Sequence, residues 1–68
     1  MDKLTLKDSV KNQPFRRFIL KLTDGQEFEI GDPDRFAVSP DKNIAIVFID
    51  QHYHVVDTDN VTSLEFFP

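Results

Sequence analysis

The amino-acid sequence predicts a mainly β protein: a small, strongly bent antiparallel barrel of five or six short strands, preceded by a short helix. The first observation is the unbroken apolar run at residues 44–49, which is too short to cross a membrane and too rich in β-branched residues to favour a helix. The second is that other short segments alternate apolar and polar residues and are separated by turns rich in Asp, Gly and Pro. Short strands joined by tight turns usually curl into a barrel.

The length of 68 residues predicts a single domain, 1–68, near the lower limit for a chain without covalent cross-links. The sequence has no Cys, which excludes disulfides and thiolate zinc sites. Its seven Phe supply a large apolar area for packing. Association with further copies is the other common source of stability for so small a fold.

A short helix is expected over residues 6–12. Residues 5–8 have the form of a capping box, with Thr5 as the cap. Leu6 and Val10 then lie one turn apart on one face. Pro14 ends the helix, because the residue before a proline avoids the helical conformation.

A hairpin is predicted around Gly25, and side-chain pairing decides its register. A two-residue loop would set apolar residues opposite acidic ones. A three-residue loop ending at Gly25 pairs Leu20 with Phe28, and on the other face it sets Lys21 opposite Glu27. The three-residue loop is therefore preferred, with Gly25 in the left-handed conformation that this turn requires.

The central run 44–49 is apolar on both faces and needs cover on both sides. One face is expected to line the barrel, and the other to meet the helix or a second copy of the protein. Because the two faces of this run are equally apolar, the sequence does not fix the register of the 44–56 hairpin. Asp32 is expected to cap one turn of tight helix before the next strand. The other strands are expected at 36–38, 53–56 and 61–67, with turns at 39–43 and 57–60.

Charge is distributed unevenly. Residues 1–22 hold six basic and two acidic residues, whereas residues 23–68 hold two basic and ten acidic residues. A basic end on an acidic body can steer one copy toward another or bind an anion weakly. The simpler interpretation, which we prefer, is a solvated surface that keeps an apolar protein soluble.

Several short motifs occur along the chain after the expected helix. They are Pro14-Phe15-Arg16-Arg17-Phe18, Leu22-Thr23-Asp24-Gly25-Gln26, Pro33, Phe36-Ala37-Val38-Ser39-Pro40, Val55-Val56-Asp57 and Val61-Thr62-Ser63-Leu64-Glu65. With these motifs the chain resembles a group of short, uncharacterised bacterial proteins. In such relatives Arg17 is commonly Pro, and Asp57 is commonly followed by an apolar residue, so residues 58–60 depart from the pattern. The resemblance implies an SH3-like or Sm-like small barrel and brings no activity with it.

Three groups of residues that include Asp have the composition of possible chemical sites. Asp50, His52 and His54 project to one face of an extended segment and could bind a metal ion, although the polar end of a hairpin is the simpler interpretation. The stretch 57–60 begins like a calcium loop but lacks its glycine, and Asp32 with Asp34 flanks a proline, so turn capping is preferred for both. No nucleophile motif or phosphate-binding loop is present, so we expect neither an enzyme nor a cofactor.

RNA binding is the main alternative function, because Sm-like rings bind RNA. Arg16 and Arg17 beside Phe15 form a basic, aromatic segment that could contact an anion or RNA. The acidic turns at 32–34 and 57–59 would repel phosphate, which makes nucleic acid the weaker interpretation.

The sequence thus favours a non-catalytic interaction or self-assembly module, with a homo-oligomer or another protein as partner and no membrane. The candidate interface residues are Val47, Ile49, Phe66 and Phe67, because the apolar surface exceeds what one small core needs. No export signal is recognisable in the charged N-terminal stretch, so a cytoplasmic location is expected. A small metal-binding protein is the remaining alternative.

Overall fold

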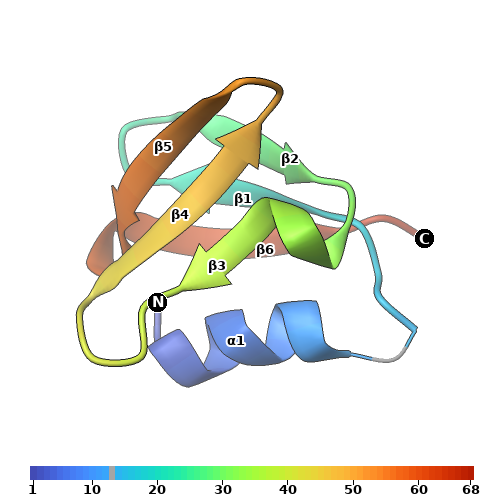
Figure 1. The fold of residues 1–68 in the computed structure, drawn as a ribbon, viewed down its shortest axis with the longest axis horizontal. Helices are drawn as coiled ribbons and strands as arrows, with labels where there is room; N and C mark the ends of the chain where they lie inside the picture. Colours follow the sequence, from blue (N-terminus) through green and yellow to red (C-terminus); the bar gives the residue numbers. More distant parts are fainter. Residues whose placement is uncertain (13) are drawn as a thin grey trace.

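One α-helix, six strands and two short 3-10 helices make up the fold in the computed structural model, which describes residues 1–12 and 14–68 (Figure 1). The mainly β class and the short preceding helix are confirmed. The elements are α1 (Lys3–Lys11), β1 (Phe18–Leu22), β2 (Glu27–Ile30), η1 (Pro33–Arg35), β3 (Phe36–Val38), β4 (Ile44–Ile49), β5 (His52–Asp57), η2 (Thr58–Asn60) and β6 (Val61–Phe66).

Helix α1 begins at Lys3, three residues before the expected start. Asp2 is the N-cap, and its carboxylate accepts a hydrogen bond from the N–H of Leu4 at 3.1 Å. The expected capping box is wrong, because Thr5 lies inside the first turn of the helix. Asp and Thr are both good N-caps, so the local pattern alone did not distinguish them.

The helix packs through the apolar side predicted for it. Leu6 is fully buried and Val10 packs against the core at partial exposure, while the helix lies beside β3 (Figure 1). At the other end, the N–H of Asn12 donates to the carbonyl of Asp8 at 3.2 Å. The expected effect of Pro14 on the residue before it lies outside the described residues.

The β1–β2 hairpin has the predicted three-residue loop. Leu20 faces Phe28 and Lys21 faces Glu27 in the register. Gly25 has a φ of +90°, a conformation that residues with a Cβ rarely adopt. The register, the loop length and the role of the glycine are therefore all confirmed.

The short connecting segments form as expected. Asp32 caps η1 by accepting a hydrogen bond from the N–H of Asp34 at 3.0 Å, and Pro33 occupies the first helical position. In the turn before β4, the hydroxyl of Ser39 accepts a hydrogen bond from the N–H of Lys42 at 3.0 Å. Across this turn, β3 pairs with β4 in antiparallel orientation.

The structure settles the register of the β4–β5 hairpin, which the sequence left open. A two-residue turn, Asp50-Gln51, sets Ile49 opposite His52 and Phe48 opposite Tyr53. Asp50 adopts a φ of +53°, and Asp is among the few residues with a side chain that tolerate this region.

Strand β6 returns to pair with β1, so the last strand lies beside the first. Phe66 faces Phe18 and Leu64 faces Leu20. The side chains of Leu64 and Phe66 therefore lie on one face of β6, as predicted, and pack against the core. The pairing is irregular after Lys21, where β6 begins.

The charged side chains of β1 and β6 also pair. The ammonium of Lys21 lies 2.6 Å from a carboxylate oxygen of Glu65, so its ion pair is with β6 although Glu27 faces it on β2. The hydrogen bond and the negative charge of Glu65 raise the pKa of Lys21 above its usual value of 10.5.

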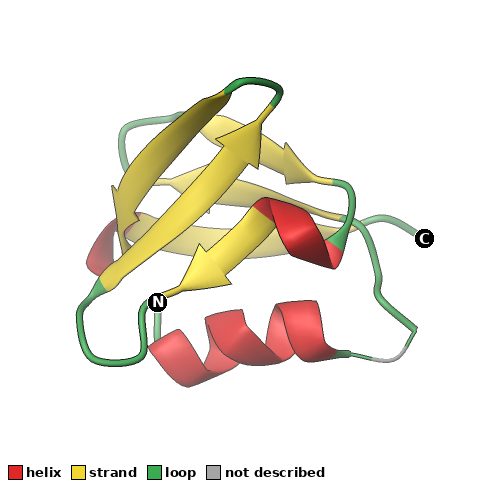
Figure 2. Cartoon of the chain, viewed as in Figure 1, coloured by secondary structure: helices red, strands yellow, loops and turns green. Residues whose placement is uncertain are grey.

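The strands form two three-stranded antiparallel sheets, in the orders β2-β1-β6 and β3-β4-β5 (Figure 2). The strands of one sheet run obliquely across those of the other. Among the described residues no strand pairing joins the two sheets, so the predicted closed barrel is not observed. The sheets instead face each other across a common core.

Phe18 lies at the centre of this core and is fully buried. The ring of Phe66 is 5.4 Å away between centroids, and the rings of Phe15 and Phe36 are each 6.1 Å away. Tilted and edge-to-face contacts of this kind are favourable beyond the area they bury. The buried apolar residues are Leu6, Phe18, Leu20, Phe28, Ile30, Phe36, Ala45, Val47, Val56 and Val61.

Candidate interaction surface

Within one chain, strand β4 packs into the core through one face, and helix α1 does not cover its other face, so that alternative is wrong. Cover by a second copy, the other alternative that the sequence offered, stays a prediction. Ala45 and Val47 are fully buried toward the core, whereas Ile44 and Ile46 on the other face are half-buried. Phe48, on that same face, keeps 41% of its surface exposed. Helix α1 lies beside β3, and no element passes in front of β4 and β5 in Figure 1.

The uncovered side of the β3-β4-β5 sheet is apolar across all three strands. Side chains alternate between the two faces of a strand, and the strand register brings the outward ones into rows. One row runs from Ala37 through Ile46 to Val55, and the next contains Phe48 and Tyr53. We call this surface the outer apolar face, and it consists of Ala37, Ile44, Ile46, Phe48, Tyr53 and Val55.

The exposure of this face is greatest on β5. Tyr53 is 68% exposed and Val55 is 59% exposed. Each lies opposite an outward residue of β4, Phe48 and Ile46 respectively, so the exposed apolar surface continues from β5 onto β4. Contiguous apolar surface on a folded chain typically marks a site of interaction.

The border of the outer apolar face is acidic. A shallow hollow of about 360 Å³ beside Phe48 is lined by Asp32, Asp34, Arg35 and Asp50. Arg35 pairs with Asp32 at 3.2 Å. No cation among the described residues lies within ion-pair distance of the other two carboxylates, so this end of the face carries net negative charge.

The structure places two of the predicted interface residues inside the molecule. Val47 is fully buried and Ile49 packs against the core, because both point to the inner face of β4. Val47 is therefore unavailable as a surface contact in the isolated chain. The outward positions of the same strand are Ile44, Ile46 and Phe48.

The other predicted residues come together in one cluster. The guanidinium carbon of Arg16 lies 5.2 Å from the centroid of the Phe66 ring, and that of Arg17 lies 4.2 Å from the centroid of Phe67. Arg16 also donates a hydrogen bond to the carbonyl of Phe67 at 3.2 Å. Both phenylalanines are half-buried, so the arginines cover part of the aromatic surface that the sequence left without a partner.

Helix α1 presents a different surface, which is basic with an apolar centre. Lys3, Lys7 and Lys11 recur every four residues, as neighbours along one side of a helix do. Leu4 lies between them and is 64% exposed. The helix therefore carries one exposed apolar side chain among three cations and one carboxylate, that of Asp8, which follows Leu4 by one turn.

The arrangement does not gather ligands for a metal ion. His52 and His54 are on the inner-face positions of β5, and the ring of His54 packs 5.0 Å from that of Phe28. Across residues 1–12 and 14–68, no three His, Cys, Asp or Glu side chains come close enough to hold a metal. Asp57 instead accepts a hydrogen bond from the N–H two residues later at 2.9 Å, the turn capping expected of it.

Sequence reasoning missed Tyr53 and Val55, although a signal for them was present. They alternate with the two histidines, and each faces an outward residue of β4 once the two-residue turn is known. The turn itself gave no clear signal, because its left-handed residue is Asp50 and not a glycine.

Comparison with known proteins identifies no relative from which a role for the outer apolar face could be inferred. No family model, curated protein or solved structure matches the chain. Within the part of the chain that the structure describes, no helix combines the length and the apolar character needed to cross a membrane.

Proposed function

We propose that the protein is a non-catalytic cytoplasmic module that works by associating with copies of itself. The observation that carries the proposal is the outer apolar face, where Phe48, Tyr53 and Val55 are all exposed. Aromatic residues grouped on an exposed sheet are typical of the centre of an interface. Burying them in a contact removes apolar surface from water, which is the main driving force for association.

The partner surface that fits best is helix α1 of a second copy. Its exposed Leu4 matches the apolar centre of the outer face, and its lysines match the acidic border at Asp34 and Asp50. Opposite charges around an apolar centre orient two surfaces and speed their encounter. Because two different surfaces meet, each contact leaves a free helix on one copy and a free outer face on the other, so the contact can build rings or open chains.

The same proposal extends to the fold. We infer that the two sheets are related to SH3-like and Sm-like small barrels. Consecutive antiparallel hairpins, and a last strand that returns beside the first, support this relationship. The open edges between the sheets distinguish this chain from a barrel that pairs all its strands.

Sedimentation and light scattering from micromolar to millimolar concentration test the proposal. The mass is expected to rise above that of the 7.9 kDa monomer as concentration increases. The double variant Tyr53→Ser, Val55→Ser is expected to remain monomeric with an unchanged Tm, because both side chains are largely exposed. A wild-type chain that remains monomeric throughout the range would refute self-association.

A charge exchange tests the choice of α1 as the partner surface. Lys7→Glu and Asp34→Lys are each expected to weaken association, and the two together to restore it, because the exchanged charges again attract. Lys42→Glu, in the turn before β4, is the control, because it changes the net charge by the same amount as Lys7→Glu at a position outside α1. If Leu4→Ser has no effect while Tyr53→Ser abolishes association, the contact joins two outer faces instead. Steeply salt-dependent binding of single-stranded RNA, lost on Arg16→Ala with Arg17→Ala, would favour the Sm-like alternative.

A further inference from the structure

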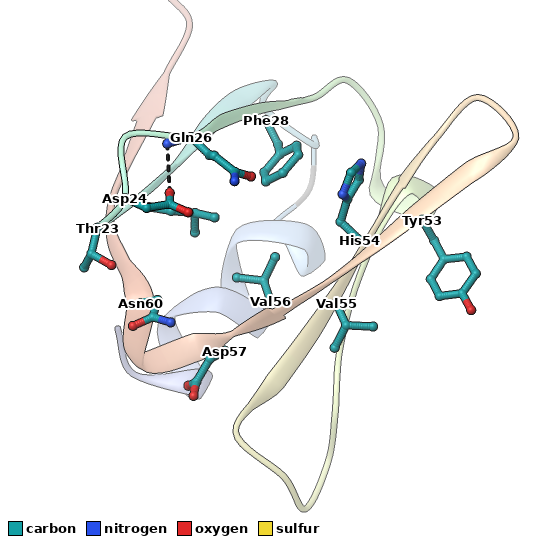
Figure 3. A pocket seen from close by; sticks show the side chains of 11 residues that line it. Thr23, Asp24, Gln26, Phe28, Tyr53, His54, Val55, Val56, Asp57 and Asn60 are labelled. Atoms are coloured by element: carbon teal, nitrogen blue, oxygen red, sulfur yellow. Dashed lines mark hydrogen bonds between the residues drawn. The ribbon is translucent and has the colours of Figure 1, made fainter.

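A groove runs between the two sheets along the open edge of β5 (Figure 3). Strands β2 and β5 are outer strands of different sheets and are not paired with each other. The space between them is a cavity of about 470 Å³, within the range of ligand-binding pockets. Leu22, Phe28 and Val56 supply its apolar lining.

The edge of β5 turns free backbone groups toward this groove. Tyr53 and Val55 line the groove although their side chains point away from it in Figure 3, so they contribute main-chain atoms. The hydrogen bonds between β4 and β5 support this orientation. The N–H of Thr58 donates to the carbonyl of Asn43 at 2.9 Å, so these two residues form a hydrogen-bonded pair. Hydrogen-bonded and non-hydrogen-bonded pairs alternate along antiparallel strands, so the pair of Val55 with Ile46 is not hydrogen-bonded, and the N–H and C=O of Val55 point away from β4.

The groove has a defined length. At one end the N–H of Thr23 donates to the carbonyl of Asn60 at 2.8 Å and joins the two sides. At the other end the rings of Phe28 and His54 meet with centroids 5.0 Å apart. The strand from His54 to Asp57 covers about 10 Å, which matches a bound segment of about three residues.

The charge of the groove selects its ligand. Asp24 stands at the Asn60 end, and one of its carboxylate oxygens accepts a hydrogen bond from the N–H of Gln26 at 3.0 Å. The side chain of Asp57 points away from the groove, as those of Tyr53 and Val55 do (Figure 3). None of the described residues that line the groove is Lys or Arg. A cationic side chain placed there would therefore meet the carboxylate of Asp24 and no competing cation.

We propose that this groove binds a short extended peptide, which adds as a strand to the edge of β5 and places a Lys or Arg beside Asp24. Main-chain hydrogen bonds supply the affinity in this mode of recognition, and side-chain pockets supply the specificity. The site is separate from the outer apolar face, because it uses the backbone of Tyr53 and Val55 and not their side chains.

The experiment is a titration of the ¹⁵N-labelled protein with an acetylated and amidated five-residue peptide that alternates valine and lysine. The amide signals of Tyr53 and Val55 are expected to shift, and the exchange of the Val55 N–H to slow. The variant Asp24→Asn is expected to bind about two-fold to five-fold more weakly, and Asp57→Asn, whose side chain points away from the groove, is the control that binds as the wild type does. Asparagine keeps the backbone cap in each variant, so both retain the fold. Binding persists in the Tyr53→Ser, Val55→Ser variant, which keeps the backbone groups.

Two control peptides make the result decisive. A peptide alternating valine and glutamate is expected to bind more weakly, because the groove is acidic. A valine–lysine peptide methylated on the nitrogens that face β5 is expected not to bind, because it lacks the donors that a strand needs. Equal binding of either control, or no shift at Val55 with millimolar peptide, would overturn the proposal.

Discussion

The guanidinium of Arg17 lies over the ring of Phe67, with 4.2 Å between its central carbon and the ring centroid. The backbones of the same two residues are joined, since the N–H of Phe67 donates to the carbonyl of Arg17 at 3.0 Å. A cation–π contact and a main-chain hydrogen bond thus hold the last aromatic residue to the segment that leads into β1. The basic residues that suggested anion binding have a structural role within the chain.

Replacing Arg17 should loosen this connection without affecting the core. An exposed cation–π contact is worth about 0.5–1 kcal/mol, so Arg17→Ala is expected to speed hydrogen exchange at the Phe67 N–H by about two-fold to five-fold. Arg35→Ala, another exposed arginine, is the control. Equal exchange rates in both variants would show that the ring contact contributes nothing.

Gly25 is the position where a side chain should be most harmful to the first hairpin. Its φ of +90° is unfavourable for any residue with a Cβ, so Gly25→Val is expected to destabilise the protein by about 1–2 kcal/mol. Gly31→Ala is the control, because a Cβ there meets nothing within 4 Å and its φ lies outside the positive range. Thermal unfolding compares them, and an unchanged Tm in Gly25→Val would contradict the loop assignment.

Two valines test which face of the β3-β4-β5 sheet is inside. Val47→Ala removes buried carbon and leaves a cavity, so a loss of about 2 kcal/mol is expected in denaturant unfolding. Val55→Ala makes the same chemical change where 59% of the side chain is exposed, and a loss below about 0.5 kcal/mol is expected. Equal losses would mean that the outer face is covered in solution.

The start of α1 can be tested by removing each candidate cap. Asp2→Ala is expected to cost about 1 kcal/mol, because the N–H of Leu4 loses its acceptor. Thr5→Ala is expected to be neutral or slightly stabilising, because alanine is the better residue inside a helix. The opposite ranking in urea unfolding would restore the capping box that the sequence suggested.

The Lys21–Glu65 pair predicts a dependence of stability on alkaline pH. The pKa of Lys21 is raised in the folded protein, so the stability it contributes is fully present below its ordinary pKa of 10.5 and is lost as pH rises through the folded value. The Tm difference between wild type and Glu65→Gln is therefore expected to be constant from neutral pH to about pH 9.5 and to shrink above 10.5. A difference that persists at higher pH would show that the pairing is not electrostatic.

Local patterns were sufficient where each face of a strand had a distinct character. The β1–β2 register followed from Leu20 and Phe28 on one face and Lys21 and Glu27 on the other. The pattern was insufficient for β4, which is apolar on both faces. Its inward residues, Val47 among them, could not be separated from its outward ones without the partner strands.

The sequence by itself determined the β class, the position of each strand and the turn at Gly25, because these depend on residues close together in the chain. Only the tertiary structure decided that two sheets remain unpaired between β2 and β5 and that Phe48, Tyr53 and Val55 share one exposed surface. Those features depend on contacts between distant segments. Their energies come from burial and strand pairing in three dimensions, which the order of residues along one strand does not specify.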